Sequence, residues 1–575
     1  METGLRVLNS VSLAAVWTAV GVAIAAYAFR LVRAWRGGTP AGTAAMREEA
    51  GKGGGDRLAT VLLVAVALAG IGLRVWQFGA VPGGFNHDGA MAAVDGKALA
   101  DHGTDRFGTF LPAHLTAWGF GQMSSLLSYL IAVFVKLFGL GPVTARLPQL
   151  LASLAGGVFF WLFMRDVFGK RAGLAAAAFV AIDPWHLLQS RWALDCNLLP
   201  HFFMGGLFFL NRGLSGRRPW LWVSMLFFGL CMYCYGITVY TIPPFLAAVC
   251  AYYIARKRLE ARTVLACAAI YLAVSWPFFL TMAINLFRWD TIRLPFVTMQ
   301  YFPDSVRSND ILFFSEHPFR QLAANFQCLL DTTVLQKKDL PWNDIEGFGT
   351  VFLCSMPFVA AGVLELLRAR TRGAKGLVVF ALLAGAWVGL ATNEVNVNRI
   401  NLVYYGIMMF IVLGMRFVAE EIRFAGRATA VLYAVLAVLL AHAYFGSYAA
   451  SIGNYFCQGF AEALADAEGS GAEKLYITSD AMGRGAWQSS EIMTLFHDRT
   501  DALYFQGKTN VSGGKERLPY KERYTYTSIV GPVVRQGLDE HAAFLVRDIE
   551  AGYFLESDYE VRKHGRFCSA VPPRP

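Results

Sequence analysis

Two short polar stretches place a carboxylate where an apolar run ends. The first reads NHDG over residues 86–89 and contains Asp88, and the second reads RWALD over 191–195 and ends with Asp195. A charged side chain in lipid is costly, so acids at such positions face water, a cavity or a partner. A carboxylate can accept a proton from a hydroxyl group, and neighbouring imidazole, guanidinium and amide groups can bind a polar ligand. Asp88 and Asp195 are therefore either two parts of one polar site or two ordinary solvated loop acids.

The composition is that of a polytopic membrane protein. Hydrophobic residues make up 55% of the 575 residues and only 16% are charged, which excludes an ordinary soluble globule. The net charge of +10 could indicate nucleic acid binding. The basic residues, however, occur in short clusters between apolar runs, as in cytoplasmic loops. We therefore expect a membrane as a partner, and no nucleic acid.

The apolar runs predict an all-α bundle of about twelve membrane-spanning helices. Some runs are shorter than an ideal span, so tilted or broken helices are expected. The runs lie near 8–30, 58–79, 143–164, 172–190, 197–211, 219–235, 241–255, 263–283, 350–367, 376–391, 402–416 and 427–446.

Every second connection between these runs carries a basic cluster, which the positive-inside rule assigns to the cytoplasm. Arg30, Arg33 and Arg36 follow the first run instead of a cleavage site, so that run is expected to remain in the protein. Both chain ends then lie outside the cytoplasm. The external segments are 80–142, 191–196, 236–240, 284–349, 392–401 and 447–575.

Two external segments need their own interpretation. Residues 123–140 are apolar enough to span, yet counting them would invert every later basic loop. We therefore expect a helix in the outer interface, and the alternative is a true span with another run misassigned. Residues 284–349 are long for a structureless loop, so we expect short helices that form either a lid over a site or a structural cap.

After Tyr448 the apolar runs shorten to strand size, as in KLYITSD, DALYFQG, AAFLVRD and YEVRKHGRF. This pattern predicts a small soluble α/β domain over 450–575. Cys457 and Cys568 bracket the domain and could form a disulfide outside the cytoplasm, although spacing alone does not establish their pairing.

Motifs around both carboxylates resemble those of one class of enzyme. The run from His87 to Pro112 contains a turn with Gly103, Asp105 and Gly108. It is followed by ARLP at 145–148, DPWH at 183–186, DCNL at 195–198 and NVNRIN at 396–401. Together these are similar to the lipid-dependent membrane glycosyltransferases of the GT-C class, in particular the family 39 group of protein O-mannosyltransferases and aminoarabinose transferases. The resemblance covers about 58–450 and is strongest over 80–200.

The resemblance implies transfer of a sugar from a polyprenyl-phosphate donor to a protein, glycan or lipid acceptor. Asp88 would be the general base, and Asp195 would orient the acceptor or sugar or stabilise charge at the anomeric carbon. In-line displacement would invert that carbon. The expected substrate-binding residues are His87, Gln122, His186, Arg191, Arg399, Tyr404 and Tyr405.

The sequence departs from the family pattern at two positions. Gly89 stands where the family often has Glu, which puts a metal-binding form of the motif in doubt. Gln122 lies near the position where many relatives have Lys, so Arg399 would supply more of the positive charge for the lipid phosphate. His87 could ligate a metal or make local hydrogen bonds. We expect no divalent metal and no cofactor besides the lipid-linked donor.

The chain thus divides into an extra N-terminal helix and cytoplasmic linker (1–57), a GT-C-like catalytic domain (58–449) and the external domain (450–575). We expect a multi-pass protein of a bacterial-type inner cell membrane, with an extracytoplasmic active site. A secondary transporter is one alternative, since Pro243 and Pro244 break a helix. The other is a membrane-anchored binding protein that works through its external domain.

Overall fold

The computed structural model describes residues 2–36, 57–118, 121–303, 311–337, 339–369, 371, 374–479, 481, 487–527, 542–554 and 557–573. The predicted linker at 37–55 and residues 304–310 of the predicted lid lie outside these ranges.

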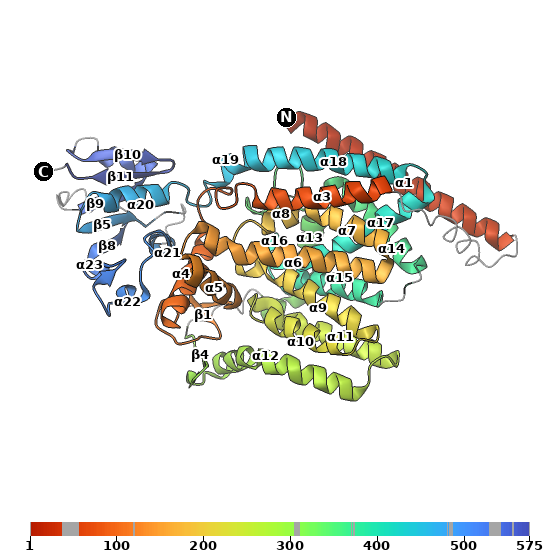
Figure 1. Cartoon of the computed structure of the whole chain (residues 1–575), viewed down its shortest axis with the longest axis horizontal. Helices are drawn as coiled ribbons and strands as arrows, with labels where there is room; N and C mark the ends of the chain where they lie inside the picture. The colour runs from red at the N-terminus through yellow and green to blue at the C-terminus, as the bar shows by residue number, and fades with distance from the viewer. Residues whose placement is uncertain are drawn as a thin grey trace.

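A bundle of helices forms the larger part of the molecule (Figure 1), and each of the twelve predicted segments contains a long helix. The helices are α1 (Glu2–Arg36), α3 (Arg57–Val75), α6 (Pro142–Phe168), α7 (Lys170–Ile182), α9 (Leu199–Leu214), α10 (Pro219–Cys231), α11 (Ile242–Ala255), α12 (Ala261–Phe287), α14 (Met356–Arg368), α15 (Gly376–Ala391), α17 (Val403–Glu421) and α18 (Ala425–Ala443). Within the described residues, 6 helical segments are long and apolar enough to cross a membrane alone. The prediction of a multi-pass α-helical fold is confirmed.

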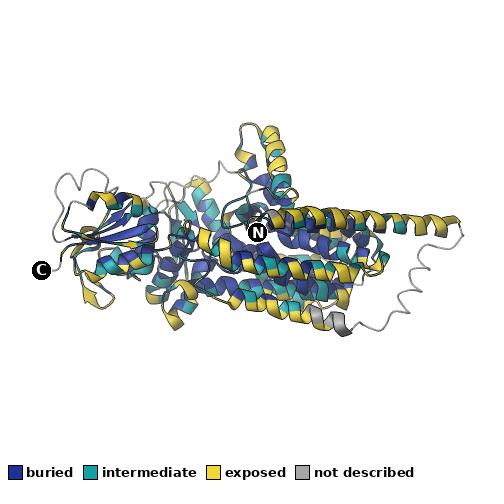
Figure 2. Cartoon of the chain, turned by 90° about the horizontal axis from the view of Figure 1, so that it is seen from above, coloured by how far each residue is buried: buried dark blue, intermediate teal, exposed yellow. Residues whose placement is uncertain are grey.

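Helix α17 is the central helix of the bundle. Of its most apolar window, 78% is buried, against 28% for α12 and for the segment containing α18. Helix α14 packs closely on α17 because glycines face backbone at their crossing, where a side chain on Gly362 or Gly414 would collide with the carbonyl of Phe410 or Phe358. The outer helices expose long apolar faces (Figure 2), as expected of surfaces that contact lipid.

The first external segment forms a compact unit at one end of the bundle. It contains α4 (His87–His102), the paired strands β1 (Leu115–Ala117) and β2 (Gly121–Met123), and α5 (Leu126–Phe138). Helix α5 has 13 residues and is therefore about 20 Å long, shorter than the hydrocarbon core of about 30 Å. It packs against α4 and α6. This length and position agree with the predicted interfacial helix better than with a span.

The second external segment contains a β-hairpin as well as a helix. The hairpin is β3 (Ile292–Leu294) and β4 (Val297–Met299), and the helix is α13 (Pro318–Thr333). Thr298 donates its N–H to the carbonyl of Leu111 and accepts the N–H of Ala113. The hairpin is thus joined to the first external segment, whereas the sequence predicted only short helices here.

A separate C-terminal domain confirms the predicted small α/β unit. Its sheet has the order β10-β11-β9-β5-β8, and β5 runs parallel to both β8 and β9. The strands are β5 (Lys474–Thr478), β8 (Tyr524–Thr527), β9 (Ala542–Arg547), β10 (Glu560–His564) and β11 (Phe567–Val571), and the helices include α20 (Phe460–Gly469), α21 (Trp487–His497) and α22 (Ala502–Phe505). The run DALYFQG, predicted as a strand, forms α22. Helix α21 packs against α4, so this domain lies at the same end of the bundle (Figure 1).

Cys457 and Cys568 do not form the disulfide considered from the sequence. Both side chains are buried, and neither is joined in a disulfide. Cys457 belongs to the main apolar core together with Phe567, whereas Cys568 packs in a second cluster with Phe544 and Phe554. Since neighbouring residues of a strand point to opposite faces, the β11 strand separates the two thiols by the thickness of the sheet.

Candidate active site

Asp88 and Asp195 line one cavity of about 140 Å³. Its walls come from the first turns of α4, the β1–β2 hairpin, the segment before α9 and the turn before α17. The lining residues are Asp88, Met91, Ala92, Ala117, Trp118, Met123, Leu194, Asp195, Cys196, Tyr235 and Asn398. Two carboxylates that are distant in sequence therefore reach one small space.

Asp88 lies in the first turn of α4. The side-chain oxygen of Asn86 caps the helix by accepting the N–H groups of Asp88 at 2.9 Å and Gly89 at 3.2 Å. The Asp88 side chain is 41% exposed, and the Nε2 atom of His87 lies 3.8 Å from its carboxylate. The His87 ring is 5.3 Å from the ring of Trp118, between centroids. The positive end of the α4 dipole therefore faces a carboxylate that solvent and ligands can reach.

Gly89 is the point where α4 touches the segment that carries Asp195. A Cβ atom at this position would lie 2.5 Å from the carbonyl oxygen of Ala193 and 3.2 Å from the ring of Phe85. Only a residue without a side chain permits this approach. The absence of the family's Glu at this position thus has a steric reason, and the same close contact brings Asp88 and Asp195 to one cavity.

Asp195 begins a short 3-10 helix, η1 (Asp195–Asn197), and accepts the N–H of Cys196 at 2.7 Å. This turn is tied to the segment before α17 by Asn401, whose side-chain nitrogen donates to the Asn197 side chain at 3.0 Å. Asn401 in turn accepts the indole N–H of Trp185 at 2.9 Å. These amide contacts hold the 396–401 turn beside the cavity.

Cys196 also lines the cavity but is not suited to act as a nucleophile. Burial raises the pKa of its thiol well above the usual range, and the negative charges of Asp195 and Asp88 raise it further. The thiol therefore stays protonated at neutral pH. The two carboxylates are the groups in the cavity that can exchange a proton with a substrate hydroxyl.

Gln122 and Arg399 are not among the lining residues, but each is adjacent in sequence to one of them. Gln122 lies on β2 next to Met123, and Arg399 lies on α16 (Val397–Ile400) next to Asn398. The Arg399 guanidinium donates to the carbonyl of Asn393 and lies 3.6 Å from the Glu394 carboxylate. Its side chain is 19% exposed. Among the lining residues of the described chain there is no arginine or lysine.

His186, Tyr404 and Tyr405 lie in a buried group outside the cavity lining. His186, on α8 (Pro184–Gln189), contacts Arg74 at 2.7 Å and the Tyr405 hydroxyl at 3.1 Å. The same hydroxyl lies 3.1 Å from Nδ1 of His201. The Tyr404 ring stacks on Trp185. The structure thus places these residues in the packing behind the site.

Arg191 is fully buried and makes its hydrogen bonds to the protein itself. Its guanidinium donates to the Tyr444 hydroxyl and to the carbonyls of Leu73, Arg74, Trp76, Gln77 and Val81. These carbonyls belong to the end of α3 and the turn leading towards α4. The geometry gives Arg191 a role in fixing this turn and does not place it among the cavity residues.

Besides Asp88 and Asp195, none of the lining residues was predicted as a site residue, and three of the others could contact a sugar. Asn398 lies inside the NVNRIN motif, and its side-chain oxygen is buried and accepts no hydrogen bond within the described residues. Tyr235 precedes η2 (Gly236–Tyr240), which falls in a predicted external connection. Trp118 directly follows β1. The sequence signal that could have identified all three is their position in or next to a predicted external segment.

One sequence comparison and the fold point to the same class of protein. A sequence model of the family described as dolichyl-phosphate-mannose-protein mannosyltransferase matches residues 124–280, which run from α5 into α12. This match over part of the chain, together with the shared fold, indicates a glycosyltransferase of the GT-C class.

One solved structure shows the same fold at low sequence identity. The crystal structure of ArnT from Cupriavidus metallidurans bound to undecaprenyl phosphate gives a TM-score of 0.52 at 15% identity, covering 90% of this chain and 100% of that chain. The Archaeoglobus fulgidus oligosaccharyltransferase in complex with Zn and sulfate gives a TM-score of 0.46 at 15% identity, covering 75% of this chain and 61% of that chain. A comparison with curated proteins gave no match.

Gly89→Leu should separate the two carboxylates, because its side chain needs space that the Ala193 carbonyl occupies. We expect a loss of about 1–3 kcal/mol in the free energy of unfolding, as for overpacking, together with loss of activity. Thermal unfolding in detergent and product formation measure the two effects. Gly72→Leu is the matched control, since Gly72 also lies in a helix and has open space around it. Wild-type behaviour of Gly89→Leu would contradict the tight contact.

Arg191→Leu should reduce stability more than it changes substrate affinity. Several buried carbonyls would lose their donor, and each costs about 1–3 kcal/mol when left unsatisfied. We expect a marked fall in the unfolding temperature of the purified protein. A variant with normal stability and a raised KM for the donor would instead show that Arg191 binds substrate.

Proposed function

We propose that the chain transfers a sugar from a polyprenyl-phosphate donor to an acceptor hydroxyl at the extracytoplasmic face of the membrane. The observation that carries this proposal is the cavity shared by Asp88 and Asp195. The ArnT structure was solved with undecaprenyl phosphate bound, which supports a polyprenyl phosphate as carrier of the sugar. Helix α12 starts at the arginine-rich end of the bundle and runs towards β4, near the cavity end (Figure 1). This separation supports an external site by the positive-inside rule.

Asp88 acts as the general base. The acceptor hydroxyl gives its proton to the Asp88 carboxylate while its oxygen forms a bond to the anomeric carbon of the sugar. The bond between that carbon and the phosphate oxygen breaks at the same time, and its electron pair leaves with the lipid phosphate. Attack opposite the leaving phosphate inverts the anomeric centre. The donor is already activated, so a single positioned carboxylate suffices as base.

Asp195 orients the acceptor or sugar hydroxyls and stabilises positive charge at the anomeric carbon. Its carboxylate faces the same cavity as Asp88, while the turn that carries it is held by Asn401. The Trp118 ring and the hydroxyl of Tyr235 provide an apolar face and a polar group, the combination that sugars require. His87 lies beside Asp88 and binds hydroxyl groups at the cavity entrance.

Arg399 and Gln122 bind the departing phosphate at the edge of the cavity. A guanidinium can form paired, charge-assisted hydrogen bonds with phosphate oxygens, and the Gln122 amide adds a neutral donor. His186, Arg191, Tyr404 and Tyr405 take no direct part in this scheme. They hold the helices and turns that form the cavity walls.

The other functions considered from the sequence find less support. A secondary transporter requires its site near the middle of the membrane, between matching halves. Here the cavity involves α4 and β1, which lie at the end of the bundle near the C-terminal domain. A binding protein that works through its external domain would not need two carboxylates in a cavity outside that domain.

Asp88→Asn should lower kcat by about 10²–10⁴, because an amide cannot accept the proton of the acceptor hydroxyl. The assay supplies a panel of polyprenyl-phosphate sugars to the purified protein and measures release of the lipid phosphate. Asp290→Asn is the matched control, an exposed external acid outside the cavity. Product formation at the wild-type rate by the folded Asp88→Asn protein would remove Asp88 from the mechanism.

Arg399→Gln should raise the KM for the lipid-linked donor by roughly 10–100-fold, the effect of losing a hydrogen bond of about 1.5–3 kcal/mol to a charged group. Donor titrations at saturating acceptor give this value. Arg320→Gln, which changes an exposed arginine on α13, should leave the KM unchanged. An equal response of the two variants would show that Arg399 does not bind the phosphate.

A further inference from the structure

The C-terminal domain contacts the beginning of α4. The ring of Phe85, just before the helix, stacks on Phe496 of α21 with centroids 4.4 Å apart. The Phe85 N–H donates to the carbonyl of Phe456 at 2.5 Å. Gly84 allows this approach, since it has a φ of +70° and a side chain here would collide with the Phe456 carbonyl. The first turn of α4, which carries Asp88, therefore packs against the domain.

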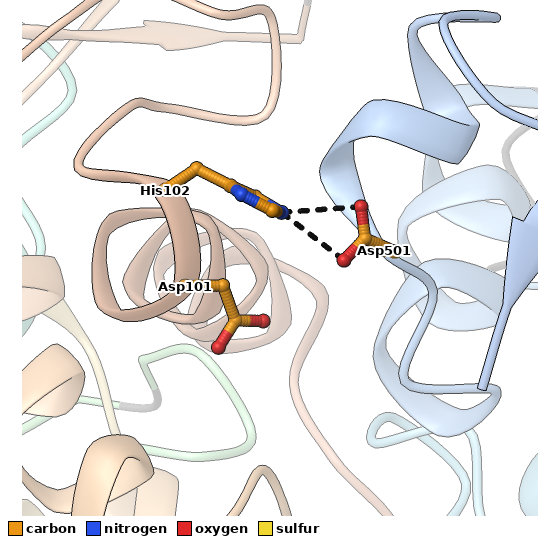
Figure 3. A group of neighbouring side chains, drawn as sticks. All are labelled: Asp101, His102 and Asp501. Atoms are coloured by element: carbon orange, nitrogen blue, oxygen red, sulfur yellow. Dashed lines mark hydrogen bonds and ion pairs between the residues drawn. The ribbon is translucent and has the colours of Figure 1, made fainter. Parts of the chain in front are cut away.

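The domain also contacts the other end of α4 and the loop that follows. Nε2 of His102, in the last turn, lies 3.1 and 3.2 Å from the two carboxylate oxygens of Asp501 (Figure 3). The side chain of Gln506 donates to the carbonyl of Arg106 at 3.0 Å. The ring of Phe107 packs edge-on against Phe505. The His102–Asp501 pair and its neighbours thus attach the far end of the helix.

Helix α4 and its loop behave as one body. The buried Arg106 donates its backbone N–H to Asp95 at 3.0 Å, forms an ion pair with the same carboxylate at 2.5 Å, and donates to the carbonyl of Thr116 at 2.8 Å. Asp95 lies in the middle of α4, and Thr116 lies on β1 beside the cavity wall. A displacement at His102 would therefore be transmitted to Asp88 and to the β1 strand.

We propose that the C-terminal domain is a clamp that positions Asp88, and that His102 and Asp501 are its positioning pair. This inference rests on the proposed function for its effect on catalysis. The charged groups facing His102 are Asp501 from the domain and Asp101 and Lys97 from α4 itself. The His102 ring contacts both carboxylate oxygens of Asp501, so this pair attaches the last turn of α4 to the domain.

The test compares His102→Ala and His102→Gln in the full-length protein. In His102→Ala we expect faster amide exchange over residues 86–95, a roughly tenfold lower kcat and an unchanged donor KM, because the base is misplaced but the phosphate site is intact. His102→Gln should restore wild-type amide exchange and wild-type kcat, since its amide can donate to Asp501.

Arg562→Gln is the control, because it removes ion pairs with Asp466 and Glu560 inside the C-terminal domain. It should change neither exchange over 86–95 nor kcat. Gln506→Ala is a second variant of the clamp and should also increase amide exchange over residues 86–95. It provides the test if His102→Ala does not fold. Unchanged exchange over 86–95 in every folded clamp variant would overturn the proposal.

Amide exchange also tests the clamp independently of the proposed function. Faster exchange in His102→Ala, in a protein that shows no sugar transfer with any donor, would support the clamp and reject the function. Asp101, His102 and Asp501 are also close enough to share a metal ion, with ligand atoms within 4.8 Å of one another. If EDTA increased amide exchange over residues 86–95 of the wild-type protein as much as His102→Ala does, a metal bridge would replace the direct pair. That result would overturn this form of the clamp.

Discussion

Backbone contact between α4 and the 191–195 segment is the constraint on which the site depends. At Gly89 the helix approaches the Ala193 carbonyl so closely that no side chain fits between them. The segment cannot move away, because Arg191 binds the carbonyls at the end of α3 and Asn401 binds the turn that follows Asp195. A distance between two carboxylates is thus determined largely by backbone packing. The chemistry of the cavity follows from contacts that themselves contain no catalytic group.

Hydropathy and charge predicted the bundle well because the bilayer imposes simple requirements. A span must be apolar over most of its length, and every one of the twelve predicted runs contains a helix. The charge pattern also identified residues 123–140 as an exception despite their apolar character, and α5 is indeed a short helix against α4. The C-terminal domain was less predictable locally. DALYFQG alternates like a strand, but Asp501 caps a helix there by accepting the N–H of Leu503.

Sequence proximity was a poor guide to which polar residues surround the cavity. His186 and Arg191 stand close to Asp195 in the chain, yet their partners are Tyr405, Arg74 and backbone carbonyls of α3. Those acceptors have no sequence signature, since any residue supplies a carbonyl. Asn398 shows the converse. It lies far from both aspartates in sequence and reaches the cavity only because Asn401 holds its turn against Asn197.

The distribution of charge indicates how the two halves of the reaction are separated. Arg74, Arg146 and Arg191 are buried and donate to backbone carbonyls, so these cations stabilise the frame. The described cavity lining contains carboxylates, aromatic rings and a side-chain amide, and Arg399 is the sequence neighbour of the lining residue Asn398. A phosphate would be repelled from Asp88 and Asp195 and attracted by a guanidinium. In the proposed reaction the lipid phosphate would therefore lie on the side of the 396–401 turn and the acceptor hydroxyl at α4, with the anomeric carbon between them.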